Sequence, residues 1–189
     1  MMDIDGVLAD FMYGFTKLAA DKFGTPVTEN HLYERWDETP GLSRNQVQWG
    51  WAQIMQSGSF WADLNSLVRA EVFNRIERLS FIADTYFATA RNGQNVKIQT
   101  EWWLRERGVI SPTVLVTGRK GEAAAALGAT HLIDDKAGNA LCAYYLNPGL
   151  KSYILDRPYN RFDHTIVGSG VKRVTTVEEF LTDVEVACE

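Results

Sequence analysis

The chain opens with Met1-Met2-Asp3-Ile4-Asp5-Gly6-Val7-Leu8-Ala9-Asp10, and the order of charged and apolar residues in this stretch indicates the kind of fold that follows. In an extended backbone Asp3 and Asp5 lie on the same side, about 6–7 Å apart. Like charges at that separation repel each other, so the pair needs a cation, a shared proton or bulk water. Gly6 permits a turn conformation that is closed to other residues. The pattern suits a nucleophile and a proton donor held around a metal ion.

Two other kinds of structure share parts of this pattern. Asp-x-Asp-Gly also occurs in surface turns, where the aspartates bond to their own backbone. A calcium-binding loop needs Gly at its sixth position and Glu at its twelfth, and here those positions hold Leu8 and Gly14. The calcium loop is therefore excluded, whereas catalysis and a plain turn remain equally open from this stretch alone.

Composition places the chain among ordinary soluble proteins. Its 189 residues, 46% of them hydrophobic, fit one domain or one domain with an insertion. The net charge of −5 argues against broad binding to nucleic-acid polymers or anionic membranes, which requires basic surface. Cys142 and Cys188 form no metal-binding pair, and no leader-like or membrane-spanning run is recognised. A cytoplasmic location is expected.

Hydrophobic periodicity divides the rest of the chain into two parts. Residues 11–80 show only helical patterns, with helices expected at 11–23, 28–36, after Ser43 and through 68–79. Beyond residue 80, short apolar strands alternate with helices, which predicts a parallel sheet with helices on both faces. The expected strands are 86–88, 113–116, 131–133 and 152–155, and the expected helices are 96–107, 121–127, 136–146 and 177–188.

Polar residues follow four of the expected strands. They are Asp3 and Asp5, then Thr89, then the segment 117–120, then the pair Asp134 and Asp135. Ligands of parallel sheets bind beyond the carboxyl ends of the strands, so these side chains should converge. Several carboxylates would repel a phosphate unless a hard cation lay between them, and Mg²⁺ prefers such oxygen ligands. The set therefore favours chemistry on a phosphate ester.

These residues resemble, in order, the four motifs of the haloacid-dehalogenase (HAD) phosphatase superfamily: Asp3-Ile4-Asp5-Gly6-Val7-Leu8, Thr89, Lys120 and Ile133-Asp134-Asp135. Finer features resemble the 5'(3')-deoxyribonucleotidase branch and its phage and bacterial relatives, namely Asp5–Phe11, Pro40–Ser43, Thr89–Arg91, Thr100–Leu104 and Leu155–Asn160. The resemblance implies a HAD-like Rossmannoid α/β core in residues 1–12 and 81–189. A small helical cap, residues 13–80, would be inserted after the first strand.

The resemblance also implies a role for each matching residue. Asp3 would be the nucleophile that forms an aspartyl-phosphate, and Asp5 the general acid and then the base. Thr89 and the Ala90 N–H would hold the phosphate, which Lys120 would neutralise. Asp3, the Asp5 carbonyl and Asp134 would hold Mg²⁺, with Asp135 completing the metal site.

Three departures from the family pattern affect this assignment. Only Met1 and Met2 precede Asp3, where the family has a full apolar strand, so either the strand is short or the natural chain starts earlier. Ala90 stands where animal deoxyribonucleotidases carry a second hydroxyl residue. Arg119 lies beside Lys120 and could share or take its role, although Lys120 is preferred.

The aromatic residues of the insertion have two possible uses. A small helical cap needs them for its own core, which should account for most of them. A nucleobase also stacks well on an aromatic face, and Phe11 and Trp36 are the preferred candidates for that contact. Arg91 and Lys136 flank the expected phosphate site, where each would either contact the substrate or be a plain surface charge.

The expected function is that of a Mg²⁺-dependent phosphomonoesterase acting on a small phosphorylated substrate, with a (deoxy)nucleoside monophosphate preferred. One alternative is a HAD phosphatase for another ester, such as a sugar phosphate or a 3'-phosphate end. A second alternative is a catalytically weakened domain that binds a nucleotide or a protein partner, which the short first strand would motivate.

Overall fold

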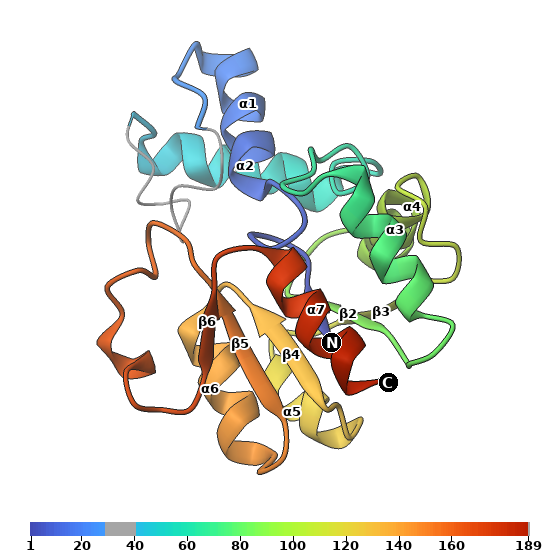
Figure 1. Cartoon of the computed structure of the whole chain (residues 1–189). Coiled ribbons are helices and arrows are strands. Elements are labelled where there is room, and N and C mark those ends of the chain that lie inside the picture. Colours follow the sequence, from blue (N-terminus) through green and yellow to red (C-terminus); the bar gives the residue numbers. More distant parts are fainter. Residues whose placement is uncertain (29–40, 189) are drawn as a thin grey trace.

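A six-stranded, all-parallel sheet forms the centre of the molecule in the computed structural model, which describes residues 1–28 and 41–188 (Figure 1). The strand order is β3-β2-β1-β4-β5-β6. The strands are β1 (Met2–Asp3), β2 (Tyr86–Thr89), β3 (Thr113–Val116), β4 (His131–Asp134), β5 (Lys151–Leu155) and β6 (Lys172–Val174). The predicted fold class is confirmed. The chain reverses its direction of travel across the sheet at β1 and β4, where parallel sheets bind ligands.

The helices lie close to their predicted positions. They are α1 (Phe11–Phe23), α2 (Arg44–Gln56), α3 (Ala70–Leu79), α4 (Val96–Arg105), α5 (Lys120–Ala126), α6 (Ala137–Leu146), the short 3₁₀ helix η2 (His164–Ile166) and α7 (Val177–Ala187). The predicted start after Ser43 is confirmed, because its hydroxyl accepts from the Gln46 N–H and the Gln46 side chain bonds back to the Ser43 N–H. The helix expected at 28–36 lies almost entirely outside the described residues.

Alternate residues of the strands point to opposite faces of the sheet and fill separate cores. Phe87 and Ile133 belong to the larger core, which α3, α4 and α7 cover. Ala88 and Leu132 belong to a second core under α5 and α6. Because both faces are covered, the strands are apolar on both sides, which explains why the sequence shows short apolar runs instead of a polar–apolar alternation.

The helices of the insertion after β1 pack in two separate groups. Helices α1 and α2 pack against each other above the sheet, whereas α3 lies beside α7 (Figure 1). The guanidinium of Arg75 on α3 pairs with the Glu185 carboxylate on α7 at 2.7 Å. The division into a core (1–12 and 81–189) and a cap (13–80) stays a prediction, and α3, which falls within the predicted cap, packs against α7 of the predicted core.

Strand β6 was not predicted from the sequence. Its residues read Lys172-Arg173-Val174, and only Val174 is buried. As an edge strand, β6 pairs with β5 alone and needs no apolar run. Hydrophobic patterning therefore gives little signal for such a strand.

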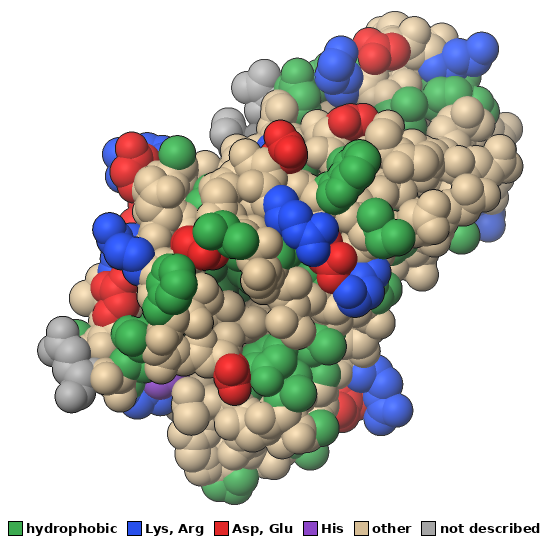
Figure 2. All heavy atoms as spheres, turned by 90° about the vertical axis from the view of Figure 1, so that its right-hand side faces the viewer, with side chains coloured by type: hydrophobic (Ala, Val, Ile, Leu, Met, Phe, Trp, Pro, Cys, Tyr) green, Lys and Arg blue, Asp and Glu red, His purple; other side chains and the backbone are tan. Residues whose placement is uncertain are grey.

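The surface carries charges of both signs. On the face drawn in Figure 2, Lys and Arg side chains lie among Asp and Glu side chains, with separate apolar groups between them. This mixture agrees with the modest net charge of −5. Within residues 1–28 and 41–188, every helix is too short or too polar to cross a membrane.

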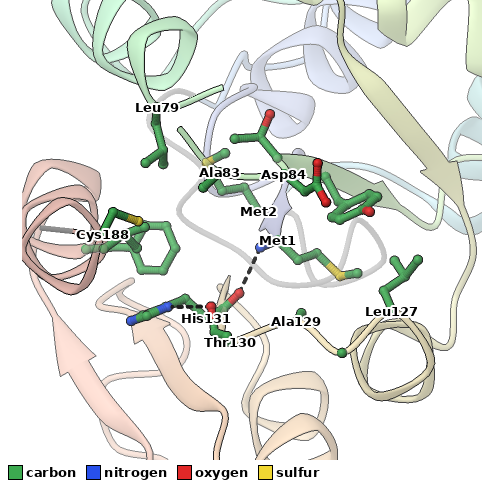
Figure 3. Close-up of a pocket in the computed structure, with 15 residues that line it drawn as sticks. Met1, Met2, Leu79, Ala83, Asp84, Leu127, Ala129, Thr130, His131 and Cys188 are labelled. Carbon is green, nitrogen blue, oxygen red and sulfur yellow. Dashed lines mark hydrogen bonds between the residues drawn. The ribbon is translucent and has the colours of Figure 1, made fainter. Parts of the chain in front are cut away.

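The central strand β1 is only two residues long, and its beginning is buried. The α-amino group of Met1 donates to the carbonyl of His131 at 2.8 Å, between β2 and β4 (Figure 3). A cavity of about 230 Å³ adjoins Met1, with Leu79, Ala83 and Leu127 among its walls. Burial lowers the pKa of this amino group from 8.0 to about 5.

The buried amine should make stability depend on pH in a defined direction. Between pH 5 and 8 the unfolded chain binds a proton at Met1 that the folded chain does not bind, so the contribution of this amine to stability should rise with pH in this window. Because the raised pKa values of Asp3 and Asp134 act in the opposite direction, the prediction concerns a difference between two chains. Relative to a chain whose Met1 amine cannot titrate, the free energy of unfolding should increase by up to about 4 kcal/mol from pH 5 to 8. The measurement is urea unfolding of the free chain beside the same chain carrying a formyl group on Met1. Identical pH profiles for the two chains would contradict this.

Candidate active site

Three carboxylates meet at the carboxyl ends of β1 and β4. Asp3 ends β1, Asp134 ends β4, and Asp135 follows it. One carboxylate oxygen of each lies within 4.8 Å of the other two, and all three side chains are buried. The β-strand register brings the two chain segments together, because Met2 is the partner of Ile133. The predicted convergence of the early and late aspartates is thus present in the structure.

A single lysine reaches into this cluster from the first turn of α5. The Lys120 Nζ lies 2.5 Å from Asp3 Oδ1 and 3.2 Å from Asp134 Oδ2. Arg119, its neighbour, is exposed and pairs with Glu122 on the same helix at 3.0 Å. Of the two cations that the sequence left open, Lys120 is the one that lies in the cluster.

The carboxylates of the cluster outnumber its cations, and this imbalance affects their pKa values. Burial and the charge of Asp134 raise the pKa of Asp3 well above its usual value, although Lys120 acts against this. Burial also opposes the charge on Lys120, but Asp134, Asp3 and Asp135 outweigh it and raise the lysine pKa. Three carboxylates and one ammonium group carry a formal charge of −2, so the donor set fits a divalent cation with hard oxygen ligands.

Hydrogen bonds hold the later carboxylates in place. The Lys136 backbone N–H donates to Asp134 Oδ1 at 2.9 Å, and the Asn139 amide donates to the same carboxylate at 3.0 and 3.1 Å. The Tyr159 hydroxyl donates to Asp135 Oδ2. Burial and the Asp135 charge raise the pKa of Tyr159, so the phenol stays protonated.

The loop after β5 supplies contacts that had no predicted role. Besides Tyr159, this loop contributes Asn160, whose amide donates to the Asp135 carbonyl at 2.7 Å, and Arg157, whose Nε donates to the Gly6 carbonyl at 2.7 Å. In the sequence, the resemblance of Leu155–Asn160 to the deoxyribonucleotidase branch indicates that this segment matters. Sequence patterns alone could not show that it touches both the first and the last motif.

The Asp5 carboxylate faces a different group. Arg91 Nη2 lies 2.8 Å from its Oδ1, and Arg91 Nε lies 2.9 Å from its Oδ2. The Thr89 hydroxyl donates to Oδ2 at 3.1 Å. Asp5 therefore does not join the carboxylate cluster through its side chain, which leaves its carbonyl as the predicted metal ligand. Arg91 is buried, so the alternative of a plain surface charge is wrong.

The other predicted substrate contacts lie in varied surroundings. Ala90 and the side chain of Lys136 are exposed. Phe11 is half-buried, and its ring lies 5.6 Å from those of Trp51 and Trp61 in an aromatic cluster of the insertion. This packing matches the structural use of the aromatic residues, and base stacking on Phe11 stays a prediction. Trp36 lies outside the described residues.

Comparison with known proteins identifies the family. Residues 1–180 match the family model described as 5' nucleotidase, deoxy (pyrimidine), cytosolic type C protein (NT5C). The chain belongs to this family. No curated protein matches the chain. The NT5C family is HAD-like, which agrees with the parallel sheet and with the motif order seen in the sequence.

Membership of the NT5C family establishes the general activity. The chain is a 5'-nucleotidase-like hydrolase of the HAD type, a phosphomonoesterase whose substrate is a small nucleotide phosphate. HAD nucleotidases use a metal ion, and the buried cluster of Asp3, Asp134 and Asp135 fits one. The family therefore explains why three like charges are buried together.

In this nucleotidase Gly6 cannot accept a side chain without moving Asp135. Its φ is +83°, and a Cβ would lie 2.2 Å from Asp135 Oδ2. Gly6→Ala should lower divalent-metal affinity by about 10- to 100-fold, because it displaces Asp135, the carboxylate that is predicted to complete the metal site. Gly24→Ala is the matched control, since Gly24 has a φ of +66° with nothing within 4 Å. The measurement is titration calorimetry with Mg²⁺. If both variants bound Mg²⁺ as tightly as the unchanged chain does, the prediction would be contradicted.

Removing the ammonium group tests the charge balance of the cluster. With EDTA present at pH 8, Lys120→Met should lose about 3–5 kcal/mol of unfolding free energy, because three buried carboxylates lose their counter-charge. The loss should shrink at pH 5, since the raised pKa values of Asp3 and Asp134 let them take up protons and stabilise the folded state as pH falls. Lys17→Met, an exposed lysine on α1, is the control. An equal loss at both pH values would show that Lys120 is not the counter-charge.

Proposed function

We propose that this chain is a Mg²⁺-dependent phosphatase resembling the 5'(3')-deoxyribonucleotidases, which hydrolyses (deoxy)nucleoside monophosphates through an aspartyl-phosphate on Asp3. The observation that carries the proposal is the buried cluster of Asp3, Asp134 and Asp135 with Lys120 at the point where the strand order reverses. The family description also supports the predicted cytoplasmic location.

Asp3 is the proposed nucleophile. Its Oδ1 accepts from the Ile4 N–H at 2.6 Å and contacts Lys120, so two groups hold this oxygen in place. A carboxylate oxygen of Asp3 would attack phosphorus as the ester P–O bond breaks, and water would later release the phosphate from Asp3. Lys120 would neutralise the transferred phosphoryl group, and electrostatic stabilisation is the main contribution an enzyme makes to such a reaction.

Asp5 is the proposed general acid and base. It would give a proton to the departing alcohol oxygen in the first step and take one from the attacking water in the second. Thr89, which ends β2 and bonds to Asp5, would contact the phosphate together with the Ala90 N–H. The same proposal keeps Phe11 and Trp36 as base contacts and Lys136 as a contact to sugar or phosphate.

A divalent ion would be held by the carboxylates of Asp3 and Asp134 and by the Asp5 carbonyl, with Asp135 beside them. When bound, Mg²⁺ supplies positive charge that allows a phosphate dianion to approach the carboxylates. Oxygen ligands alone, without His or Cys, favour Mg²⁺ over softer metals. The three buried carboxylates support this choice.

The proposal predicts phosphate release from nucleoside monophosphates that requires both Mg²⁺ and Asp3. Asp3→Asn should reduce kcat by at least about 1,000-fold, because the nucleophile is lost. Asp84→Asn, which changes an exposed carboxylate away from the cluster, should leave the rate unchanged. The measurement is phosphate release from a panel of nucleoside monophosphates and sugar phosphates, with Mg²⁺ or with EDTA.

Each alternative gives a different result in that assay. Equal rates for Asp3→Asn and the unchanged chain would remove the nucleophile assignment. A flat profile across the panel, or a preference for sugar phosphates, would favour another HAD phosphatase. Binding of nucleotide without turnover would favour the weakened binding domain.

A further inference from the structure

Arg91 occupies a closed network behind Asp5. Its Nε and Nη2 donate to the two oxygens of Asp5, in the two-point geometry that guanidinium and carboxylate groups favour. Its Nη1 donates to the hydroxyl of Thr100 on α4 at 2.9 Å. The flat face of the guanidinium lies 4.8 Å from the ring centre of Trp61. Both the edge and the face of this side chain are therefore engaged by the protein.

Exposure differs sharply between the two partners of this ion pair. The Arg91 side chain has an exposed fraction of 0%, whereas the Asp5 side chain keeps 23%. A substrate entering from solvent can thus reach the Asp5 carboxyl but not the guanidinium behind it. Arg91 is poorly placed for the direct contact with sugar or phosphate that its position in the sequence suggested.

The network also fixes which way Asp5 turns. Thr89 donates its hydroxyl to Asp5 Oδ2 and accepts from the Arg91 backbone N–H at 3.2 Å. Thr100 is itself fixed, because its hydroxyl donates to the Val96 carbonyl at 2.8 Å. The Asp5 carboxyl is thus held by Thr89 directly and by Thr100 on α4 through Arg91, while its side chain stays partly open to solvent.

We propose that Arg91 is a positioning residue, which orients the Asp5 carboxyl for proton exchange with the leaving oxygen. This inference rests on the proposed function. When the ester P–O bond breaks and the Asp3–phosphorus bond forms, the proton on Asp5 moves to the departing oxygen. Proton transfer depends on the distance and direction between donor and acceptor, so a carboxyl that rotates freely transfers its proton less often in the productive geometry.

The nature of the leaving group separates this role from others. A nucleoside hydroxyl leaves as a strongly basic alkoxide unless it is protonated as the bond breaks, whereas nitrophenolate leaves without a proton. A residue that orients the acid should therefore matter for nucleoside monophosphates and much less for nitrophenyl phosphate. A residue that binds phosphate should matter equally for both substrates.

The test compares kcat/KM for a deoxynucleoside monophosphate with kcat/KM for p-nitrophenyl phosphate. The constant kcat/KM reports only the steps up to the first irreversible one. The second step, in which Asp5 acts as a base for either substrate, therefore does not obscure the result. The ratio of kcat/KM for the nucleotide to kcat/KM for the nitrophenyl ester is called the substrate ratio. In Arg91→Met, kcat/KM for the nucleotide should fall by about 10- to 100-fold, which is part of the contribution that a general acid makes. For the nitrophenyl ester, kcat/KM should fall by less than about threefold.

Two further variants grade the effect. Arg91→Lys keeps the charge but cannot bridge both Asp5 oxygens, so its loss on the nucleotide should be intermediate. Thr100→Val removes one hydrogen-bond partner of the guanidinium, so it should lower the substrate ratio by a smaller factor than Arg91→Met does. Arg105→Met, an Arg-to-Met change on the exposed side of α4, is the matched control and should change neither rate.

The possible outcomes are distinct. Equal losses of kcat/KM for both substrates in Arg91→Met would overturn the inference. A rise in KM with kcat unchanged would also overturn it and would favour direct contact between Arg91 and the phosphate. If Arg91→Met is not folded by circular dichroism, the ratio for Arg91→Lys decides in the same way. If the unchanged protein hydrolyses neither ester, the proposed function fails and the inference falls with it.

Discussion

The burial of three carboxylates around one ammonium group is the constraint on which the rest of the structure depends. Asp3, Asp134 and Asp135 would repel one another strongly in a low-dielectric interior, and Lys120 offsets only part of their charge. A protein retains such a cluster only where the surrounding groups hold it and a cation can complete it. Because HAD nucleotidases use a metal ion, the unfavourable burial of these carboxylates is explained by their fit to a cation.

Much of the nearby structure serves to hold those carboxylates in place. Asp135 occupies the space that a side chain at position 6 would need, which requires glycine there. The loop after β5 reaches back through Tyr159 and Asn160, so the last part of the site is fixed by residues beyond the last motif. Hydrogen bonds to the charged form of a carboxylate favour that form, and here they also fix its direction.

Asp3 and Asp5 are two residues apart, yet the fold gives them separate surroundings. Asp3 lies among carboxylates and Lys120, whereas Asp5 bonds to Arg91. Trp61 lies under the Arg91 guanidinium and stacks on Phe11, so the aromatic packing of the insertion continues directly into the surroundings of Asp5. Two carboxylates with different environments can take different chemical roles, and here the difference comes from their partners.

The sequence by itself determined the sheet, most helices and the meeting of Asp3 with Asp134, because apolar runs of strand length must be buried and parallel strands end at one edge. It missed β6, whose edge position requires no apolar pattern. Only the tertiary structure decided that Lys120 instead of Arg119 enters the cluster and that Arg91 turns to Asp5. Side-chain direction and long-range partners depend on packing between segments, and local residue order does not encode them.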